Sequence, residues 1–309
     1  MTDLHAAVQQ YLDVRRALGF KLRQHEGLLR DFVQFMDNRG QTMITIDLAV
    51  AWATAPTTDH PYTWKRRLSI IRNFARYVQT LDPATEVPPA DYLAYRYQRP
   101  VPFLYTDDEI RALMGAAASL LPSFRAMTYQ TLIGLLATTG MRLGEALRLN
   151  QSDVSARDQE IIIRFTKFGK SRVVPVHPTV ADALEVYRRH RNTYAQGRPL
   201  SESFFLSLRG TRLLDVMVHK TFGALVDHVG LAPRAGSGAV RLHGFRHTFT
   251  VATIRDWYAT GQPVASQLPL LSAYLGHVNP VSTYWYVQTT PELLCLAMEH
   301  GSHVLKGTR

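Results

Sequence analysis

The sequence predicts a mainly α-helical protein with a small antiparallel β-sheet, divided into two domains. Three observations lead to this fold class. Apolar side chains recur at close to the helical period through most of the chain. A proline-rich stretch separates a shorter N-terminal part from a longer C-terminal part. In the second part, two short runs rich in Ile or Val flank a glycine-containing turn of hairpin length.

The N-terminal part is expected to hold helices over residues 4–18, 28–36, 46–53 and 62–79. The apolar residues of the last helix, from Leu68 to Val78, fall on one face. Its other faces carry five basic residues and no acidic one: Lys65, Arg66, Arg67, Arg72 and Arg76. Such a run is most often a solvated helix face, but the lack of a compensating carboxylate makes contact with phosphates the competing interpretation.

A domain boundary is expected near residue 100. Residues 81–102 contain five prolines, a composition that disfavours a helix and favours a linker. Beyond them, Thr106 and Glu109 have the spacing of a capping box that opens a helix over residues 109–117. We therefore expect a helical N-terminal domain over residues 1–82, a linker over 83–103 and a second domain over 104–309.

The strands of the second domain are expected over residues 160–165 and 172–176, with residues 166–171 as the turn between them. A helix over residues 180–191 follows, and helical patterns dominate the remainder. Because strands and helices do not alternate regularly, a doubly wound parallel sheet is not supported.

Composition narrows the class of protein. With 46% hydrophobic residues in 309, the chain can bury a core, so a disordered or fibrous protein is excluded. No apolar run approaches the roughly 18 residues that span a bilayer, and no signal peptide is apparent. The single cysteine, Cys295, cannot form an internal disulfide, so a cytoplasmic location is expected. A net charge of +10 suits a polyanionic partner.

Common nucleotide, metal and thiol sites are not indicated. The sequence lacks a Gly-x-Gly-x-x-Gly motif and a Walker lysine loop. His243 and His247 are four residues apart, but Gly244 stands where a zinc protease has glutamate and no third ligand is obvious, so no metal site is expected. Cys295 lies in an apolar helical pattern that favours packing over catalysis.

A different group of residues suits attack by a phenolic oxygen on a phosphodiester. Guanidinium groups bind phosphate oxygens through two hydrogen bonds and keep their charge. Each member has a structural alternative when considered alone: a surface charge for Arg142, a helix cap for His277 and a core residue for Tyr286. The complete group is Arg142, Lys167, His243, Arg246, His277 and Tyr286.

In these residues and their surroundings, the chain resembles the tyrosine recombinases, or lambda-integrase family. The resemblance covers about residues 104 to 300, and the basic N-terminal helices resemble the core-binding domain of that family. Five segments carry it, in order: TGMRLGE (139–145), TKFGKSRVVP (166–175), LHGFRHT (242–248), LGH (275–277) and TYWYV (283–287).

The resemblance implies a nucleophile and a phosphate clamp. Tyr286 would form a 3′-phosphotyrosyl bond, while Arg142 and Arg246 would hold the scissile phosphate and stabilise its developing charge. Tyr284, two residues earlier, is a rival nucleophile; the spacing from the preceding LGH motif favours Tyr286.

The remaining roles are also implied by the resemblance. Lys167 would protonate the departing 5′-oxygen, with Lys170 as its rival, and Lys170 and Arg172 are expected to contact DNA. His243 would assist proton transfer from the tyrosine. His277 would donate a further hydrogen bond to the phosphate. Glu145 would orient its neighbours in the site.

The implied activity is site-specific cutting and rejoining of double-stranded DNA, without a cofactor, by a tetramer assembled on specific recombination sites. The tetramer is formed by this chain alone or together with partner recombinases. The wording of residues 282–286 is most similar to recombinases of transposons and other mobile elements. Two alternatives remain: a type IB topoisomerase-like enzyme and a catalytically idle DNA-binding accessory protein. The 31 positions from Arg246 to His277 suggest an enlarged loop around residues 261–263.

Overall fold

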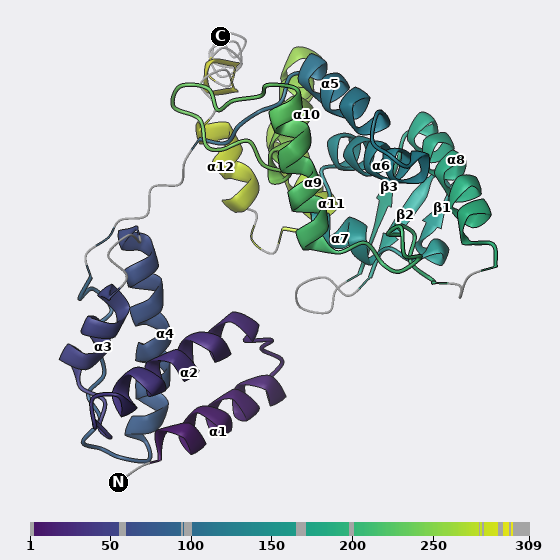
Figure 1. Ribbon diagram of the computed structural model, residues 1–309. Coiled ribbons are helices and arrows are strands. Elements are labelled where there is room, and N and C mark those ends of the chain that lie inside the picture. Colours follow the sequence, from purple (N-terminus) through teal and green to yellow (C-terminus); the bar gives the residue numbers. More distant parts are fainter. Residues whose placement is uncertain are drawn as a thin grey trace, which may run out of the picture. The chain divides into compact units, whose positions relative to one another are not determined.

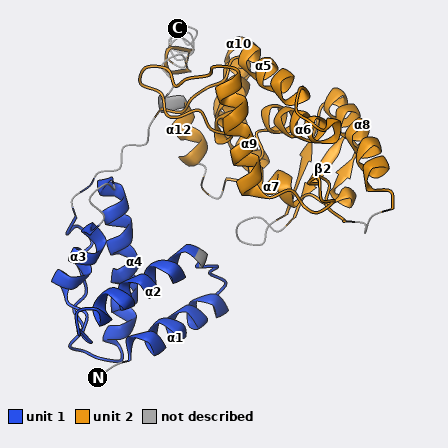
Figure 2. Ribbon diagram, viewed as in Figure 1, with its two compact units in different colours: residues 1–99 blue, residues 100–309 orange. Residues whose placement is uncertain are grey.

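The computed structural model of the chain describes residues 3–55, 60–93, 95, 101–164, 171–197, 201–277, 279, 281–289, 293–296 and 298. The chain divides into two compact units, residues 1–99 and 100–309 (Figure 2). Helices dominate both units, and one small antiparallel sheet lies in the second, so the predicted fold class is confirmed. Among the described residues, no helix is long and apolar enough to cross a membrane.

The first unit contains the four predicted helices: α1 (Leu4–Ala17), α2 (Arg23–Asp37), α3 (Ile46–Thr54) and α4 (Pro61–Gln79) (Figure 1). Helix α4 packs against all three others. Its predicted apolar face is buried, from Leu68 to Val78, in a core with Leu12, Phe32 and Trp52. Helix α2 begins five residues before the predicted start, because its first turn is polar and gives no apolar signal.

The second unit begins its helices with α5 (Asp107–Ala118), α6 (Ser123–Thr139) and α7 (Leu143–Arg148). The predicted capping box is present at α5: the Thr106 hydroxyl accepts from the backbone N–H of Glu109 at 3.2 Å, and the Glu109 carboxylate accepts from that of Thr106 at 2.8 Å. Five more helices complete the series: α8 (Pro178–Ala195), α9 (Asp215–His228), α10 (His243–Ala259), α11 (Val264–Leu275) and α12 (Val281–Thr289).

The sheet has the strand order β1-β2-β3, with both pairs antiparallel. Strands β2 (Glu160–Ile163) and β3 (Arg172–Pro175) are the predicted hairpin strands, while β1 (Val154–Ser155) is too short to leave a periodic signal. Ile161 pairs with Val174, and both are buried in the main core of the unit.

Two features position the helices that carry the predicted site. A Cβ on Gly244 would lie 2.6 Å from the ring of Tyr105, so glycine allows the start of α10 to approach the segment before α5. The ring of Phe245 then stacks on Tyr105 with centroids 4.4 Å apart.

The expectation of an enlarged loop around residues 261–263 is wrong, because only residues 260–263 separate α10 from α11.

Candidate active site

The carboxyl end of α11 is the centre of the site. The helix ends at Leu275 and is capped by Gly276, whose φ of +68° is the left-handed conformation that glycine adopts most readily. The last carbonyls of a helix lack partners within it and form the negative end of its dipole. Here the carbonyls of residues 274, 275 and 276 accept from three different guanidinium groups, those of Arg172, Arg246 and Arg142, at 2.8, 2.9 and 3.2 Å.

Glu145 joins two of these arginines. Its carboxylate accepts from Arg142 at 3.0 Å and from both terminal nitrogens of Arg172 at 2.9 and 3.1 Å. It also accepts from the backbone N–H of Arg142, which closes the first turn of α7. Burial opposes ionisation, but the hydrogen bonds and charges of Arg172 and Arg142 outweigh it and lower the pKa of Glu145 to about 2. The carboxylate is therefore charged and fixes both guanidinium groups.

Arg246 is almost completely buried on α10. Its two terminal nitrogens donate to the carbonyls of Gly140 at 3.0 Å and Leu275 at 2.9 Å, which tie the end of α6 to the end of α11. Burial and the nearby charge of Arg142 lower the pKa of Arg246 to about 10. The group thus remains cationic at neutral pH, within electrostatic range of Tyr286.

Arg142 differs from the other two arginines in exposure. Its side chain is 39% exposed, against 13% for Arg172, while its contacts with Glu145 and the carbonyl of Gly276 hold one side. A guanidinium group that is held on one side and open to solvent on the other can donate hydrogen bonds to a phosphate without losing its orientation.

Tyr286 lies on α12, against α10 and α11. Its side chain is 1% exposed, within an apolar cluster that includes Ile254 and Leu275. The hydroxyl lies 2.7 Å from Nδ1 of His247, a hydrogen-bond distance. The rival Tyr284 is 41% exposed and therefore points away from this cluster.

The two predicted histidines contact residues near Tyr286: His277 is partly buried and His243 is exposed. Nδ1 of His277 lies 2.7 Å from the hydroxyl of the fully buried Thr283, so the residue that follows the C-cap of α11 is joined to α12. His243 is the first residue of α10, and its ring lies 4.6 Å from that of His247, centroid to centroid. In the described part of the chain, no three His, Cys, Asp or Glu side chains gather as a metal site would require.

The structure thus brings together Arg142, Glu145, Arg246 and the α12 tyrosine around the end of α11. The expected general acid, Lys167, and its rival Lys170 lie outside the described residues. Arg172, which is expected to contact DNA, donates hydrogen bonds to Glu145 and to the carbonyl of Tyr274. Sequence reasoning missed this contact and that of His247, although the position of His247 directly after Arg246 was a possible signal.

The basic residues of α4 divide into two groups. Arg72 is buried and donates to the carbonyl of Pro88 at 2.9 Å, and Arg67 lies over the ring of Trp52 and donates to its carbonyl at 3.1 Å. These contacts tie α4 to its own unit. Arg66 and Arg76 are exposed, and Lys65 is half-buried with its ammonium 3.0 Å from the carbonyl of Tyr95.

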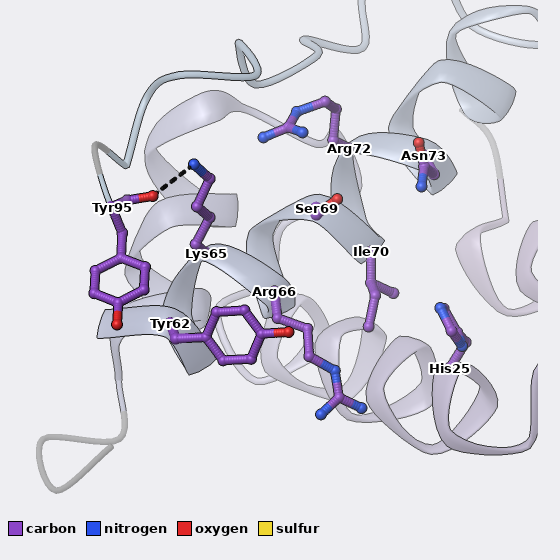
Figure 3. A pocket seen from close by; sticks show the side chains of 9 residues that line it. All are labelled: His25, Tyr62, Lys65, Arg66, Ser69, Ile70, Arg72, Asn73 and Tyr95. Atoms are coloured by element: carbon purple, nitrogen blue, oxygen red, sulfur yellow. Dashed lines mark hydrogen bonds between the residues drawn. The ribbon is translucent and has the colours of Figure 1, made fainter. Parts of the chain in front are cut away.

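Some of these basic residues, Lys65, Arg66 and Arg72, line a pocket of about 410 Å³ in the first unit (Figure 3). Its basic and aromatic side chains come from three segments, with Arg66 between Tyr62 and His25 in the view of Figure 3. Burial, then the charges of Arg66 and Arg15, lower the pKa of His25. The positive charges of Arg66 and Arg15 therefore add to the effect of burial in disfavouring the protonation of His25.

Residues 104–292, more than half of the chain, match the family described as the phage integrase family. The chain belongs to this family. Among its relatives, a Sinorhizobium fredii protein assigned as an integrase/recombinase, y4rB, is 40% identical and matches 96% of each chain. Tyrosine recombinase XerD from Caulobacter vibrioides is 27% identical and matches 80% of this chain and 74% of its own length.

Two solved structures show the same fold. The Tn1549 transposon integrase in complex with transposon right end DNA is 19% identical, with a TM-score of 0.66 over 96% of this chain and 99% of that chain. A lambda integrase dimer bound to a COC′ core site is 17% identical, with a TM-score of 0.64 over 92% of this chain and 77% of that chain. The resemblance to tyrosine recombinases, and the enzyme class of site-specific recombinase acting through a tyrosine, are confirmed.

Proposed function

We propose that this recombinase cleaves DNA with Tyr286 as the nucleophile, which forms a 3′-phosphotyrosyl bond and releases a 5′-hydroxyl. The convergence of Arg142 and Arg246 on adjacent carbonyls at the end of α11 supports the proposal most directly. Tyr286 lies on the next helix, within electrostatic range of Arg246. One cationic site next to a phenolic hydroxyl is the arrangement that attack on a phosphodiester requires.

The two arginines would share the stabilisation of the transition state. The exposed side of Arg142 would bind a non-bridging oxygen of the scissile phosphate. Arg246 would supply a fixed positive charge from its buried position on α10. Because Arg246 is already desolvated and held by two carbonyls, it does not need to reorganise when negative charge develops. Glu145 would keep Arg142 in place without contacting the substrate.

The remaining roles follow from the family resemblance. Lys167 would protonate the departing 5′-oxygen, His277 would donate a further hydrogen bond to the phosphate, and His243 would take part in proton transfer. The energy of the broken phosphodiester would be stored in the protein–DNA bond. For this reason, the reaction would need no nucleotide, metal ion or other cofactor.

The biological substrate would be double-stranded DNA carrying short specific sites, in the cytoplasm, with four copies of the chain assembled on it. Exposed basic residues of α4, including Arg66 and Arg76, would contact the phosphates. The similarity to the Tn1549 transposon integrase supports a role in moving a DNA element by integration, excision or transposition.

A covalent trap tests the proposal. The full chain is incubated, without magnesium, with nicked duplexes tiled across the DNA that flanks its own gene, and the mixture is then denatured in SDS. We expect one tile to yield a protein–DNA adduct with the wild type and Tyr284→Phe but none with Tyr286→Phe. Loss of the adduct in Tyr284→Phe alone would move the nucleophile to Tyr284. Salt-sensitive binding without any adduct would favour an idle DNA-binding protein.

The products of the reaction separate a recombinase from a topoisomerase of similar chemistry. A plasmid with two copies of the responding tile should yield deletion or inversion products with the wild type. Relaxation of supercoils without rearrangement would instead favour the type IB topoisomerase-like activity.

A further inference from the structure

The hydroxyl of Tyr286 has a defined partner on α10. Nδ1 of His247 lies 2.7 Å from it, at the short end of the range for a hydrogen bond. The centroids of the His247 and Tyr286 rings are 5.4 Å apart. The centroid of the Trp285 ring lies 5.2 Å from that of Tyr286 and 6.1 Å from that of His247. The imidazole and the phenol are therefore packed together, and their orientation is set by two helices.

Resting on the nucleophile proposed above, we infer that His247 is a catalytic residue that accepts the phenolic proton of Tyr286. In the tautomer with its proton on Nε2, the imidazole presents a lone pair at Nδ1, and the hydroxyl donates to it. The family resemblance gives the assisting role to His243. At this hydroxyl the structure describes a hydrogen bond to Nδ1 of His247, the histidine one turn further along α10.

The step balances without another reagent. As the Tyr286 O–H bond breaks, its proton moves to Nδ1 of His247, and the phenolic oxygen forms a bond to phosphorus. The bond from phosphorus to the 5′-oxygen breaks with its electron pair, and this oxygen takes a proton from the general acid proposed above, Lys167. On rejoining, His247 returns its proton to the phenolate, as microscopic reversibility requires.

The surroundings favour this transfer when substrate is bound. Tyr286 lies in an apolar cluster, where an isolated phenolate would be costly. Arg246, one residue before His247, has a fixed guanidinium group within electrostatic range of the phenol. His243 shares the same face of α10, with its ring perpendicular to that of His247. The new imidazolium would therefore be close to the phosphate that binds the arginines, and this negative charge would stabilise it.

Substrates with different leaving groups test the role directly. A nicked duplex of the responding tile is made with either oxygen or sulfur at the bridging 5′ position, and adduct formation is followed in single turnover. A thiolate leaves without protonation, so sulfur compensates for a missing general acid but not for a missing proton acceptor at the nucleophile. We expect His247→Ala and His247→Gln to be slower by about 100-fold or more on both substrates. Lys167→Ala should be slow on the oxygen substrate alone.

Three controls keep the outcomes distinct. His190→Gln changes an exposed histidine on α8 and should react at the wild-type rate. Equal salt-dependent DNA binding shows that the His247 variants are folded. His247→Gln retains a hydrogen-bonding amide that cannot take a proton, so it tests whether a hydrogen bond alone suffices.

Several results would overturn the inference. A wild-type rate in His247→Gln would mean that the imidazole only holds the tyrosine, and rescue of either His247 variant by sulfur would place its effect at the leaving group. Faster adduct formation in His247→Ala would mean that the contact restrains Tyr286. Each of these leaves the proposed nucleophile intact. By contrast, an adduct that survives Tyr286→Phe would refute the proposed function itself.

Discussion

Replacing Glu145 with glutamine should destabilise the second unit, because it removes the carboxylate charge that binds both Arg142 and Arg172. The pKa of Glu145 falls from 4.5 to about 2 on folding, with burial opposing and the Arg172 and Arg142 contacts causing the shift. At about 1.4 kcal/mol per pKa unit, the ionised carboxylate stabilises the fold by about 3 kcal/mol at pH 7. Glutamine keeps the shape of the side chain but not the charge, so most of this free energy should be lost.

The pH dependence gives the sign of the effect. Because folding lowers the pKa, the stabilisation is complete above the unfolded value of 4.5 and is lost as the pH falls through about 2. The difference in free energy of unfolding between wild type and Glu145→Gln should therefore shrink from about 3 kcal/mol at pH 7 to about 1 kcal/mol at pH 3.

Urea unfolding of the whole chain, followed by circular dichroism at several pH values, measures this difference. Glu202→Gln provides the control, because Glu202 is exposed and should change the stability little at any pH. A difference at pH 7 below about 1 kcal/mol would refute the reasoning, since it would mean that desolvation cancels the ion pairs. A difference that stays constant with pH would show that the loss comes from packing.

Other substitutions test neighbouring parts of the argument. Arg172→Lys should slow adduct formation by about tenfold or more at unchanged DNA binding. The reason is that one ammonium group cannot bridge both Glu145 oxygens and the Tyr274 carbonyl. A wild-type single-turnover rate would contradict this positioning role. Gly276→Ala should lower the free energy of unfolding by at least about 1 kcal/mol, since φ is +68° and the new Cβ would lie 2.6 Å from Arg172; an unchanged urea midpoint would speak against it. Arg66→Ala should weaken DNA binding and reduce its salt dependence in gel shifts, while Arg72→Ala should mainly lower the urea midpoint, because only Arg66 is exposed. The reverse pattern would exchange their roles.

The helices and the hairpin strands were predictable because their signals are local. The apolar period of α4 identified the face that the core covers, and the spacing of Thr106 and Glu109 identified the start of α5. The limits of such signals appear at the polar first turn of α2 and at the two-residue strand β1. The supposed loop at residues 261–263 was wrong for a related reason: a Gly-Gln-Pro sequence marks a turn but not its length.

The sequence by itself determined the chemistry available to this recombinase: two arginines, histidines and a tyrosine in an order typical of its family. Only the tertiary structure decided which of these groups meet. Arg142 and Arg246 are 104 positions apart, yet they share the end of α11, because unpaired carbonyls there must find donors from other elements. The same long-range packing places Arg172 within hydrogen-bond distance of Glu145, and His247 within hydrogen-bond distance of Tyr286. Such pairings depend on contacts between helices distant in sequence, which local periodicity does not record.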